Sequence, residues 1–552
     1  MVLTMGVPVS RRAVRATKSE TAQNERRSLL TPDVARWPVD TERPIVELSE
    51  VKKGFDGELV LNGLSLKIPT GKTTVIIGES GSGKSVLLKM MNGLVRPASG
   101  SVKLFGQELS GLSDKDTDPL RKRTGMVLQN YALIDSISVL DNVAFPLVEN
   151  IKMARSEVED RVMDLLKMLG IADAARRLPS DLSGGMKKRV SFARAVVTEP
   201  ELVLFDEPTT GLDPLMIMFV DELIQQMQER FEITSVIISH DIASVFALAD
   251  YIAMLHAGKI IEYGTPEEIR ATENEAVSAF ISVGGSGRLG AGSSAAAQVD
   301  AAELQTAPLI RVTDLHKSFG TNHVLRGINL EIYPKEITVI IGGSGSGKSV
   351  LMKHLLGLFL PDSGTVEIGG RLVNEMNEDE LEQLRLATGM LFQGAALFDS
   401  MSVYDNVAFP LLERRKPAPK DSVAQLVEDI LVRLQIDEIA KALPSDISAG
   451  QRKRVGLARA IVTKPSLMIY DEPTTGQDPV MIRYVDDMIV QAHTEFDLTT
   501  IVISHDMQST FRVADRIALV HQGTIAIAAD PETVKQSRDP NVRKFIFAGS
   551  ED

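Results

Sequence analysis

Two glycine-rich segments of the chain combine the residue types that bind phosphate groups. Residues 78–85 read Gly-Glu-Ser-Gly-Ser-Gly-Lys-Ser and residues 342–349 read Gly-Gly-Ser-Gly-Ser-Gly-Lys-Ser. Each follows an apolar run typical of a strand and precedes a helical stretch. In this setting the backbone N–H groups of the loop, together with the start of the helix, surround phosphate groups. In this pattern the lysine reaches the terminal phosphates and the serine after it binds Mg²⁺. The residues expected to surround the bound phosphates are Gly78, Ser80, Gly81, Ser82, Gly83, Lys84, Ser85 and Val86, and Gly342, Ser344, Gly345, Ser346, Gly347, Lys348, Ser349 and Val350.

Two adjacent carboxylates end a later apolar run in each part of the chain. They are Asp206-Glu207 and Asp471-Glu472, and each pair is followed by proline. An isolated Asp-Glu-Pro is usually an ordinary strand-to-turn transition. Side chains alternate along a strand, so after a phosphate-binding loop the aspartate is expected to support the Mg²⁺ shell while the glutamate faces the water that attacks the γ-phosphate.

The chain is an internal duplication. The two glycine-rich segments lie 264 residues apart, and later pairs such as His240 and His505 lie 265 apart. We expect a mobile tail at residues 1–43, either solvated or in contact with an anionic lipid surface, a first domain at 44–283, a linker at 284–306 and a second domain at 307–552. The linker is rich in Gly, Ser and Ala, a composition typical of a flexible tether that lets the two halves meet face to face.

Short apolar runs alternate with amphipathic stretches in both halves. Unbroken runs such as residues 202–205 and 235–239 fit strands buried on both faces of a sheet. The predicted fold class is therefore α/β, with two domains that each contain a mainly parallel sheet flanked by helices.

Composition excludes several kinds of chemistry. The 552 residues carry a formal net charge of −14, which argues against broad binding to nucleic acid. The absence of cysteine excludes disulfides, thiolate catalysis and cysteine-based zinc sites. No apolar run approaches the ~20 residues of a membrane-spanning helix, so we expect the chain not to cross a membrane.

With these motifs the chain resembles the ATP-binding-cassette family over nearly all residues outside 1–43 and 284–306. The most specific segment is Leu-Ser-Gly-Gly-Met at 182–186, which looks like the family's signature. The resemblance implies P-loop ATPase domains with a helical signature subdomain, ATP and Mg²⁺ as ligands, and composite sites in which each signature serves nucleotide held by the other half. The residues that it implies are the signature residues Ser183, Gly184, Gly185, Ser448, Ala449 and Gly450; Gln129 and Gln393 of the Q-loops, also as Mg²⁺ ligands; Asp213 and Asp478 of the D-loops; the switch histidines His240 and His505; and Phe55 and Phe319, which would stack on adenine.

The signature of the second half departs from the family pattern. It has Ala449 where the first half has Gly184. A Cβ there could crowd the γ-phosphate or a backbone geometry that only glycine reaches freely. The site built on Lys84 would borrow this altered signature, and the site built on Lys348 the intact one. We therefore expect two active but unequal ATP sites.

A segment after each Q-loop narrows the resemblance further. Residues 134–147 and 398–411 share the pattern Asp-Ser-x-Ser-Val-x-Asp-Asn-Val-Ala-Phe-Pro-Leu. This looks like the ATPase of bacterial Mla/Mce-type lipid transporters. The resemblance implies two integral-membrane permease subunits and an Mce-type substrate-binding assembly as partners, with the chain at the cytoplasmic face of the cell membrane. That family usually has one cassette per chain, so one fused chain would replace a homodimer.

Other systems remain open at this point. A generic helix that contacts any permease would also explain the shared segment. ABC-F-like factors that act on the ribosome are tandem cassettes too, but they have a long charged linker. A tandem sugar-importer ATPase is a third reading, although such proteins often have a visibly degenerate catalytic site.

Overall fold

The computed structural model describes residues 43–55, 57–150, 153–285, 307–413 and 419–547. The expected tail and nearly all of the expected linker lie outside these residues. Helix α10 (Glu275–Gly285) continues past residue 283, where the sequence suggested that the first domain would end. No helix among the described residues has the length and apolar character needed to cross a membrane.

Each half contains a six-stranded sheet whose central strands are parallel. In the first half the order is β10-β9-β3-β8-β7-β6, and only the edge strand β10 is antiparallel. Every residue of β3, β7 and β8 is buried, which explains their unbroken apolar sequences. The strands are β3 (Thr73–Ile77), β6 (Thr124–Val127), β7 (Leu202–Asp206), β8 (Thr234–Ile238), β9 (Tyr251–His256) and β10 (Lys259–Gly264).

The second half repeats this sheet in the order β16-β17-β18-β13-β19-β20. Its strands are β13 (Ile337–Gly342), β16 (Thr388–Leu391), β17 (Leu467–Asp471), β18 (Thr499–Ile503), β19 (Arg516–His521) and β20 (Thr524–Ala529). The predicted α/β class with a mainly parallel sheet in each half is confirmed.

Each half also has a four-stranded antiparallel sheet that the sequence analysis did not predict. Its strands are β1 (Pro44–Phe55), β2 (Glu58–Pro69), β4 (Ser99–Leu104) and β5 (Gln107–Glu108), and in the second half β11 (Ile310–Phe319), β12 (Asn322–Ile332), β14 (Ser363–Ile368) and β15 (Arg371–Leu372). Burial alternates along β2, as expected for a sheet with one face on the core.

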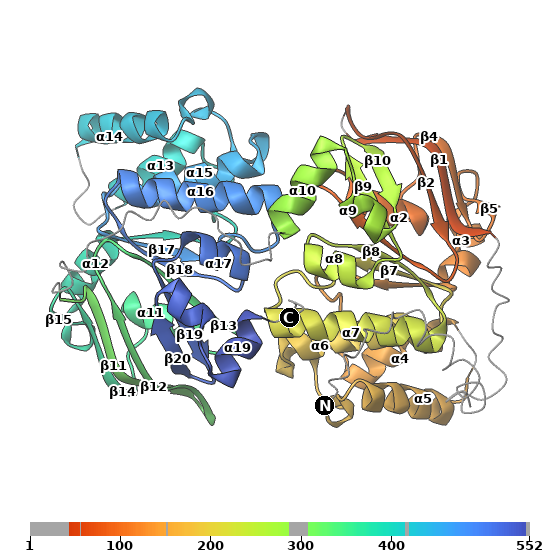
Figure 1. Cartoon of the computed structure of the whole chain (residues 1–552), viewed down its shortest axis with the longest axis horizontal. Helices are drawn as coiled ribbons and strands as arrows, with labels where there is room; N and C mark the ends of the chain where they lie inside the picture. Colours follow the sequence, from red (N-terminus) through yellow and green to blue (C-terminus); the bar gives the residue numbers. More distant parts are fainter. Residues whose placement is uncertain (1–42, 56, 151–152, 286–306, 414–418, 548–552) are drawn as a thin grey trace, which may run out of the picture.

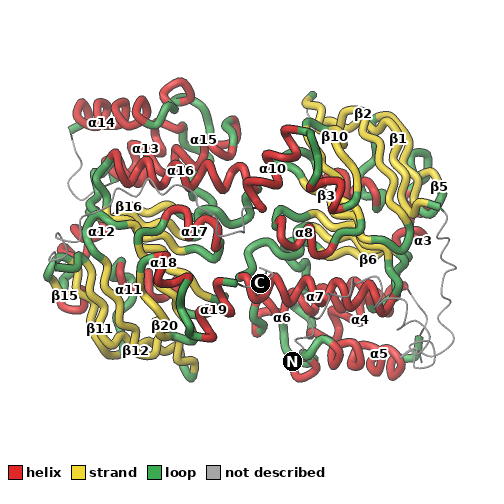
Figure 2. The backbone as a smooth tube through the Cα atoms, viewed as in Figure 1, coloured by secondary structure: helices red, strands yellow, loops and turns green. Residues whose placement is uncertain are grey.

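Helices cover the sheets and form a separate group in each half. In the first half they are α2 (Lys84–Met91), α3 (Asp114–Arg121), α4 (Val139–Asn150), α5 (Arg155–Met168), α6 (Gly184–Val196), α7 (Pro214–Phe231), α8 (Ile242–Leu248), α9 (Pro266–Arg270) and α10. In the second half they are α11 (Lys348–Leu355), α12 (Glu378–Leu386), α13 (Val403–Leu412), α14 (Lys420–Arg433), α15 (Ala449–Ile461), α16 (Pro479–Glu495), α17 (Met507–Val513), α18 (Pro531–Lys535) and α19 (Pro540–Ile546). Figure 2 shows α4–α7 at the bottom of one half and α13–α16 at the top of the other, a head-to-tail arrangement.

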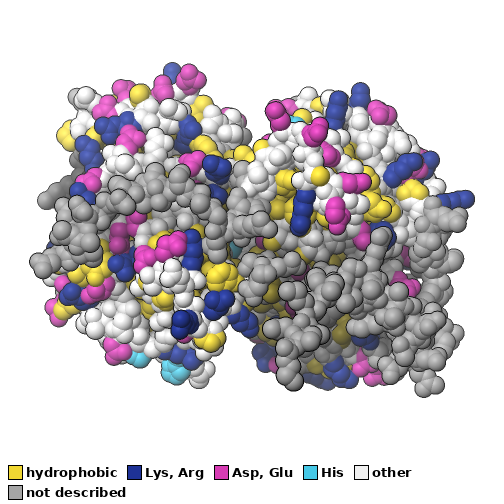
Figure 3. Space-filling view, viewed as in Figure 1, with side chains coloured by type: hydrophobic (Ala, Val, Ile, Leu, Met, Phe, Trp, Pro, Cys, Tyr) yellow, Lys and Arg dark blue, Asp and Glu magenta, His cyan; other side chains and the backbone are white. Residues whose placement is uncertain are grey.

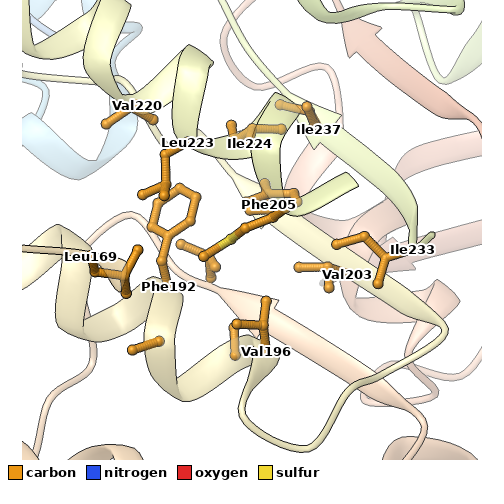
Figure 4. Packing of buried hydrophobic residues seen from close by; sticks show 14 of the residues in the cluster. Leu169, Phe192, Val196, Val203, Phe205, Val220, Leu223, Ile224, Ile233 and Ile237 are labelled. Carbon is orange, nitrogen blue, oxygen red and sulfur yellow. The ribbon is translucent and has the colours of Figure 1, made fainter. Parts of the chain in front are cut away.

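Aromatic packing fixes the signature helix α6 on the sheet. Phe192 of α6 and Phe205 of β7 are fully buried with ring centroids 5.4 Å apart (Figure 4). Burying one such side chain contributes roughly 2–3 kcal/mol. The end of β7 and the start of α6 are therefore held in a fixed relation, which matters because each carries a site motif.

The last helix of each half packs against the other half. Helix α10 of the first half packs on α16 of the second, and α19 of the second packs on α7 of the first (Figure 1). Leu215 of α7 packs against the core of the second half. Each of these two contacts thus joins a terminal helix of one half to a helix of the other half that begins directly after a D-loop.

Candidate functional site at the seam between the halves

The glycine-rich loop of each half lies at the carboxyl edge of the parallel sheet. It begins after β3 with Gly78, whose φ of +150° and close approach to the carbonyl of Leu255 leave no room for a Cβ. The ammonium of Lys84 is buried and donates to the carbonyls of Gly78 and Glu79, both at 2.8 Å. Burial lowers the pKa of Lys84, and the charge of Glu207 opposes that shift. The loop therefore holds a cation beneath the arc of backbone N–H groups.

The loop of the second half has the same arrangement. Lys348 is buried and donates to the carbonyls of Gly342 at 2.7 Å and Gly343 at 3.3 Å. Burial likewise lowers its pKa, and the charge of Glu472 opposes the shift.

The expected Mg²⁺ residues lie side by side in the first half. The hydroxyl of Ser85 donates to Asp206 at 3.2 Å across the gap between α2 and β7. Burial raises the pKa of Asp206, and the hydrogen bond from Ser85 opposes the shift. One hydroxyl and one carboxylate suit Mg²⁺, which takes few protein ligands and completes its shell with phosphate and water oxygens.

The two glutamates predicted to be catalytic have a strained backbone and the same kinds of partner. Glu207 has φ of 50° and Glu472 of 51°, a left-handed conformation that ordinary residues avoid. Glu207 accepts hydrogen bonds from Thr210 at 2.9 Å and from His240 at 2.8 Å. Burial by itself raises the pKa of Glu207, but the hydrogen bond and charge of His240 outweigh it, so the net shift is downward. Backbone strain of this kind is concentrated at active sites.

In the second half Glu472 accepts from Thr475 at 2.7 Å and lies 2.5 Å from Nδ1 of His505. The first half uses the other ring nitrogen, Nε2, of His240. Burial lowers the pKa of His505, but the hydrogen bond and charge of Glu472 outweigh it and raise that pKa overall. The pair keeps the glutamate ionised, as a base or water-orienting group requires.

The D-loops cross the seam. One carboxylate oxygen of Asp478 accepts from the backbone N–H of Ser80 at 2.9 Å, and Asp213 accepts from the N–H of Ser344 at 2.8 Å. The other oxygen of each aspartate caps its own helix, α16 or α7. Each phosphate-binding loop is therefore in contact with the opposite half.

Both switch histidines line one cleft between the halves. The cleft has a volume of about 430 Å³, and its walls include the D-loops and the starts of α8 and α17. Asp241 and Asp506 lie close enough across it that the charge of Asp506, after burial, raises the pKa of Asp241. The two histidines predicted to act in catalysis therefore line the same cleft.

The signature segments begin helices α6 and α15. Ser183 and Ser448 are the N-cap residues, each accepting from the N–H three residues on. Gly184 and Ala449 occupy the first helical position, and neither has positive φ. A Cβ on Gly184 would lie 3.5 Å from the hydroxyl of Tyr131, an ordinary contact. The expectation that Ala449 disturbs a glycine-only backbone is therefore wrong, because helical φ suits alanine. Crowding of a phosphate stays a prediction.

The remaining predicted residues are exposed. Gln129 and Gln393 follow β6 and β16 and are exposed. The Phe55 and Phe319 rings are each 46% exposed, and Lys53 and Lys317 lie over them. An aromatic ring exposed to this degree is not a core residue, which fits the expected stacking on a planar base.

Sequence reasoning missed two pairs of residues in the site. They are the threonines Thr210 and Thr475 that bind the catalytic glutamates, and the buried lysines Lys188 and Lys453 in the signature helices. All four recur in both halves at the same offset of 265 residues. That recurrence was the available signal.

The fold and these motifs define an ATPase with two cassettes in one chain. The sequence profile of the family described as "ABC transporter" matches residues 61–210 and 325–475. The chain belongs to this family as an ATP-binding protein with two cassettes in tandem, and its domains are ATPase domains.

Curated relatives support the tandem organisation. A putative ABC transporter ATP-binding protein of Vibrio vulnificus is 30% identical over 83% of this chain and 85% of its own length. The intermembrane phospholipid transport system ATP-binding protein MlaF of Haemophilus influenzae is 35% identical over 43% of this chain and 90% of its own. The methionine import ATP-binding protein MetN 1 of Rhodopseudomonas palustris is 42% identical over 42% of this chain and 62% of its own.

Proposed function

We propose that this chain is the ATPase subunit of a transporter for lipid or other hydrophobic cargo, and that it supplies both ATPase halves of one complex. It would act at the cytoplasmic face of the cell membrane, beneath two permease subunits and together with an Mce-type substrate-binding assembly. The observation that carries the proposal is a pair of equivalent apolar surfaces, one in each half.

Each apolar surface lies around the helix that follows the Q-loop. In the first half Ile134, Phe145, Val148 and Leu178 are exposed, and in the second half Phe398, Leu412 and Leu443 are exposed at the equivalent places. Val148 is 64% exposed and Leu412 40%. Large apolar side chains that stay exposed at equivalent places in both halves suit surfaces that a protein partner covers. Two copies of one surface on one chain suit two copies of one partner.

The shared Asp-Asn-Val-Ala-Phe-Pro pattern has a structural role in this surface. The buried amide of Asn142 donates to the carbonyls of Ile134, Ile137 and Ser138, and its oxygen accepts from the N–H of Ile134. Asn406 makes the equivalent bonds in the second half. The asparagine thereby fixes the loop that joins the Q-loop to the exposed helix. Movement of a partner on this helix would reach Gln129 or Gln393 through a rigid connection.

The site residues have the following roles in the proposed mechanism. The glycine-rich loop, with Lys84 or Lys348, binds the phosphates of ATP, and Ser85 with Asp206, or Ser349 with Asp471, would hold Mg²⁺. When bound, Mg²⁺ neutralises charge on the phosphates. Glu207 and Glu472 orient and deprotonate the attacking water, and His240 and His505 hold the two glutamates in position. Ser183 and Ser448 close the opposite sites when the halves press together.

Similarity supports the lipid assignment. The match to MlaF covers nearly the whole of that protein, whose name assigns it to phospholipid transport between membranes. The segments at 134–147 and 398–411 provide the same indication from within the sequence.

The test is to purify the tagged full-length chain from detergent-solubilised membranes of its own cells. We expect a permease at two copies per chain, and bound lipid in the complex. The double variant Val148→Asp, Leu412→Asp should lose the permease and keep the ATP turnover of the isolated chain, since both residues lie outside the ATP sites. Ribosomal proteins in place of a permease would reject transport in favour of an ABC-F-like role.

The face of the molecule in Figure 3 intersperses acidic and basic side chains, which does not favour an RNA surface.

A small-solute importer is the second candidate. The match to MetN 1 favours it, since that name denotes methionine import. It covers 62% of that relative, against 90% of MlaF. Reconstitution in lipid vesicles separates the two: ATP-dependent uptake of an amino acid, with no movement of labelled phospholipid, would support the importer.

A further inference from the structure

Each signature helix buries a lysine in its second turn. Lys188 of α6 is 1% exposed and Lys453 of α15 is 5% exposed. Lysine is almost never buried without partners, because removing an ammonium from water costs several kcal/mol. The partners of these two lysines therefore indicate what each is for.

The partners of Lys453 belong to two different site motifs. Its ammonium donates to the carbonyl of Gln393 at 2.5 Å and to the carbonyl of Pro473 at 2.8 Å. Gln393 is the Q-loop residue, and Pro473 follows the catalytic Glu472 directly. One side chain thus joins the signature helix, the Q-loop and the turn that carries the glutamate.

Both of the segments that Lys453 joins have a strained backbone. Glu472 has φ of 51°, and Ala395 and Ala396 of the Q-loop have φ of 60° and 48°. Such conformations cost of order 1–3 kcal/mol per residue and persist only where the surroundings enforce them. Arg459, also on α15, donates to the carbonyls of Ala395 and Ala396 at 2.8 Å each. Helix α15 therefore enforces the strained turns on either side of it.

The first half repeats the contact between the buried lysine and the Q-loop. Lys188 donates to the carbonyl of Gln129 at 3.4 Å, and its ammonium lies 5.1 Å from the centre of the Tyr131 ring. The charge of Glu207 acts on it as well. Tyr131 is replaced by Ala395 in the second half, so the ring that shares the ammonium exists only in the first half.

We propose that Lys188 and Lys453 are positioning residues for ATP hydrolysis: Lys453 holds the Q-loop backbone and the turn that carries Glu472 in one rigid unit, and Lys188 holds the Q-loop backbone of the first half. The inference rests on the catalytic role of Glu207 and Glu472 in the proposed function. It extends that function by naming the group through which the permease-facing Q-loop and the glutamate move together. Burial lowers the pKa of both lysines to about 8, so both are charged at neutral pH.

The test compares Lys453→Met and Lys188→Met with Lys441→Met, an exposed lysine of the second half, in the full-length chain. Methionine keeps the linear shape and removes the donor. We expect kcat for ATP to fall about tenfold in K453M and about threefold in K188M, as the loss of a charged hydrogen bond implies. The KM for ATP should stay within about twofold, because neither lysine touches the predicted phosphate-binding atoms. Lys441→Met should match the wild type.

The thermal unfolding temperature of each variant shows whether a reduced kcat results from unfolding of the protein. A kcat for K453M within twofold of wild type, or a raised KM at unchanged kcat, would overturn the proposal. Where K453M unfolds early, Lys453→Gln, which keeps an N–H donor, decides: a kcat nearer to wild type supports positioning, and a kcat as low as that of K453M contradicts it. The double variant E207Q, E472Q separates a failure of the lysine proposal from a failure of the proposed function. If this variant hydrolyses ATP like wild type, the catalytic assignment of the glutamates fails. If it is inactive while K453M has a normal kcat, only the lysine proposal is rejected.

Discussion

Each half has a buried aspartate near the cleft between the halves, and the two aspartates have different hydrogen-bond partners. In the second half Asp486 accepts hydrogen bonds from Ser509 and Arg512, each at 2.5 Å. In the first half the equivalent Asp221 accepts from Ser244 at 2.7 Å, and its other oxygen is buried without a hydrogen-bond partner. The arginine position is alanine, Ala247, in the first half.

Around the ATP sites, too, the halves share some groups and differ in others. The groups predicted to act on ATP are present twice, and their contacts repeat closely: glutamate with histidine and threonine, D-loop aspartate with the opposite loop. The residues behind them differ, as with Tyr131 and Ala395 around the buried lysines. The residues predicted to act on ATP are thus the same in both halves, whereas the residues that position them differ. Unequal sites would then arise from those positioning residues and from the signature each site borrows.

The catalytic glutamates give the sharpest test of this contrast. We expect Glu472→Gln to lower ATP turnover more than Glu207→Gln, because the Lys348 site would borrow the intact signature. Loss of the base should cost about a hundredfold at the affected site. Single-turnover and steady-state phosphate release from each variant measure it. Equal residual rates for the two variants would remove the predicted asymmetry.

The paired arginine should matter to stability. Arg512→Ala leaves Asp486 buried with one partner fewer, so we expect the free energy of unfolding to fall by about 2 kcal/mol. The matched control is Ala247→Arg, which offers Asp221 the missing partner and should not destabilise the first half. Urea denaturation of both variants gives the numbers. An unchanged midpoint for R512A would mean that the pair does not support the second half.

The two carboxylates also predict a pH dependence of stability. Burial raises the pKa of Asp221 and of Asp486 to about 7, from the 3.8 of a free side chain. Between these values the unfolded chain releases protons that the folded chain keeps, so stability falls as the pH rises from about 4 to about 7. Asp221→Asn cannot titrate and should make this dependence shallower. Denaturation midpoints over that range test it, and an equal slope in wild type and variant would contradict the assignment.

The smallest effect is expected at the altered signature. Ala449→Gly removes the Cβ that would crowd the phosphate at the Lys84 site, so turnover there should rise by about twofold. Glycine at the start of a helix should lower stability by up to about 1 kcal/mol. Phosphate release in an E472Q background isolates the Lys84 site. A lower turnover would show that Ala449 contributes to that site rather than limiting it.

Much of the fold could be read from the sequence because its signals are local. The buried strands β3, β7 and β8 are short unbroken apolar runs, and the glycine-rich loop is a fixed order of residue types between a strand and a helix. The antiparallel sheet was not predicted, since alternating strands such as β2 give a weaker signal. The backbone argument about Ala449 failed because sequence does not report φ: the first position of α15 is helical, and alanine suits it.

The sequence by itself determined the duplication, the phosphate-binding loops and the carboxylates, because each is a pattern of residue types at fixed spacing along the chain. Only the tertiary structure decided which groups from distant segments meet. It joined Asp213 to Ser344 across the seam, gave Lys453 its two carbonyl partners, and brought Arg512 to Asp486. These contacts depend on how the parallel strands order themselves and how the halves dock. Both are set by the packing of buried surfaces far apart in the chain.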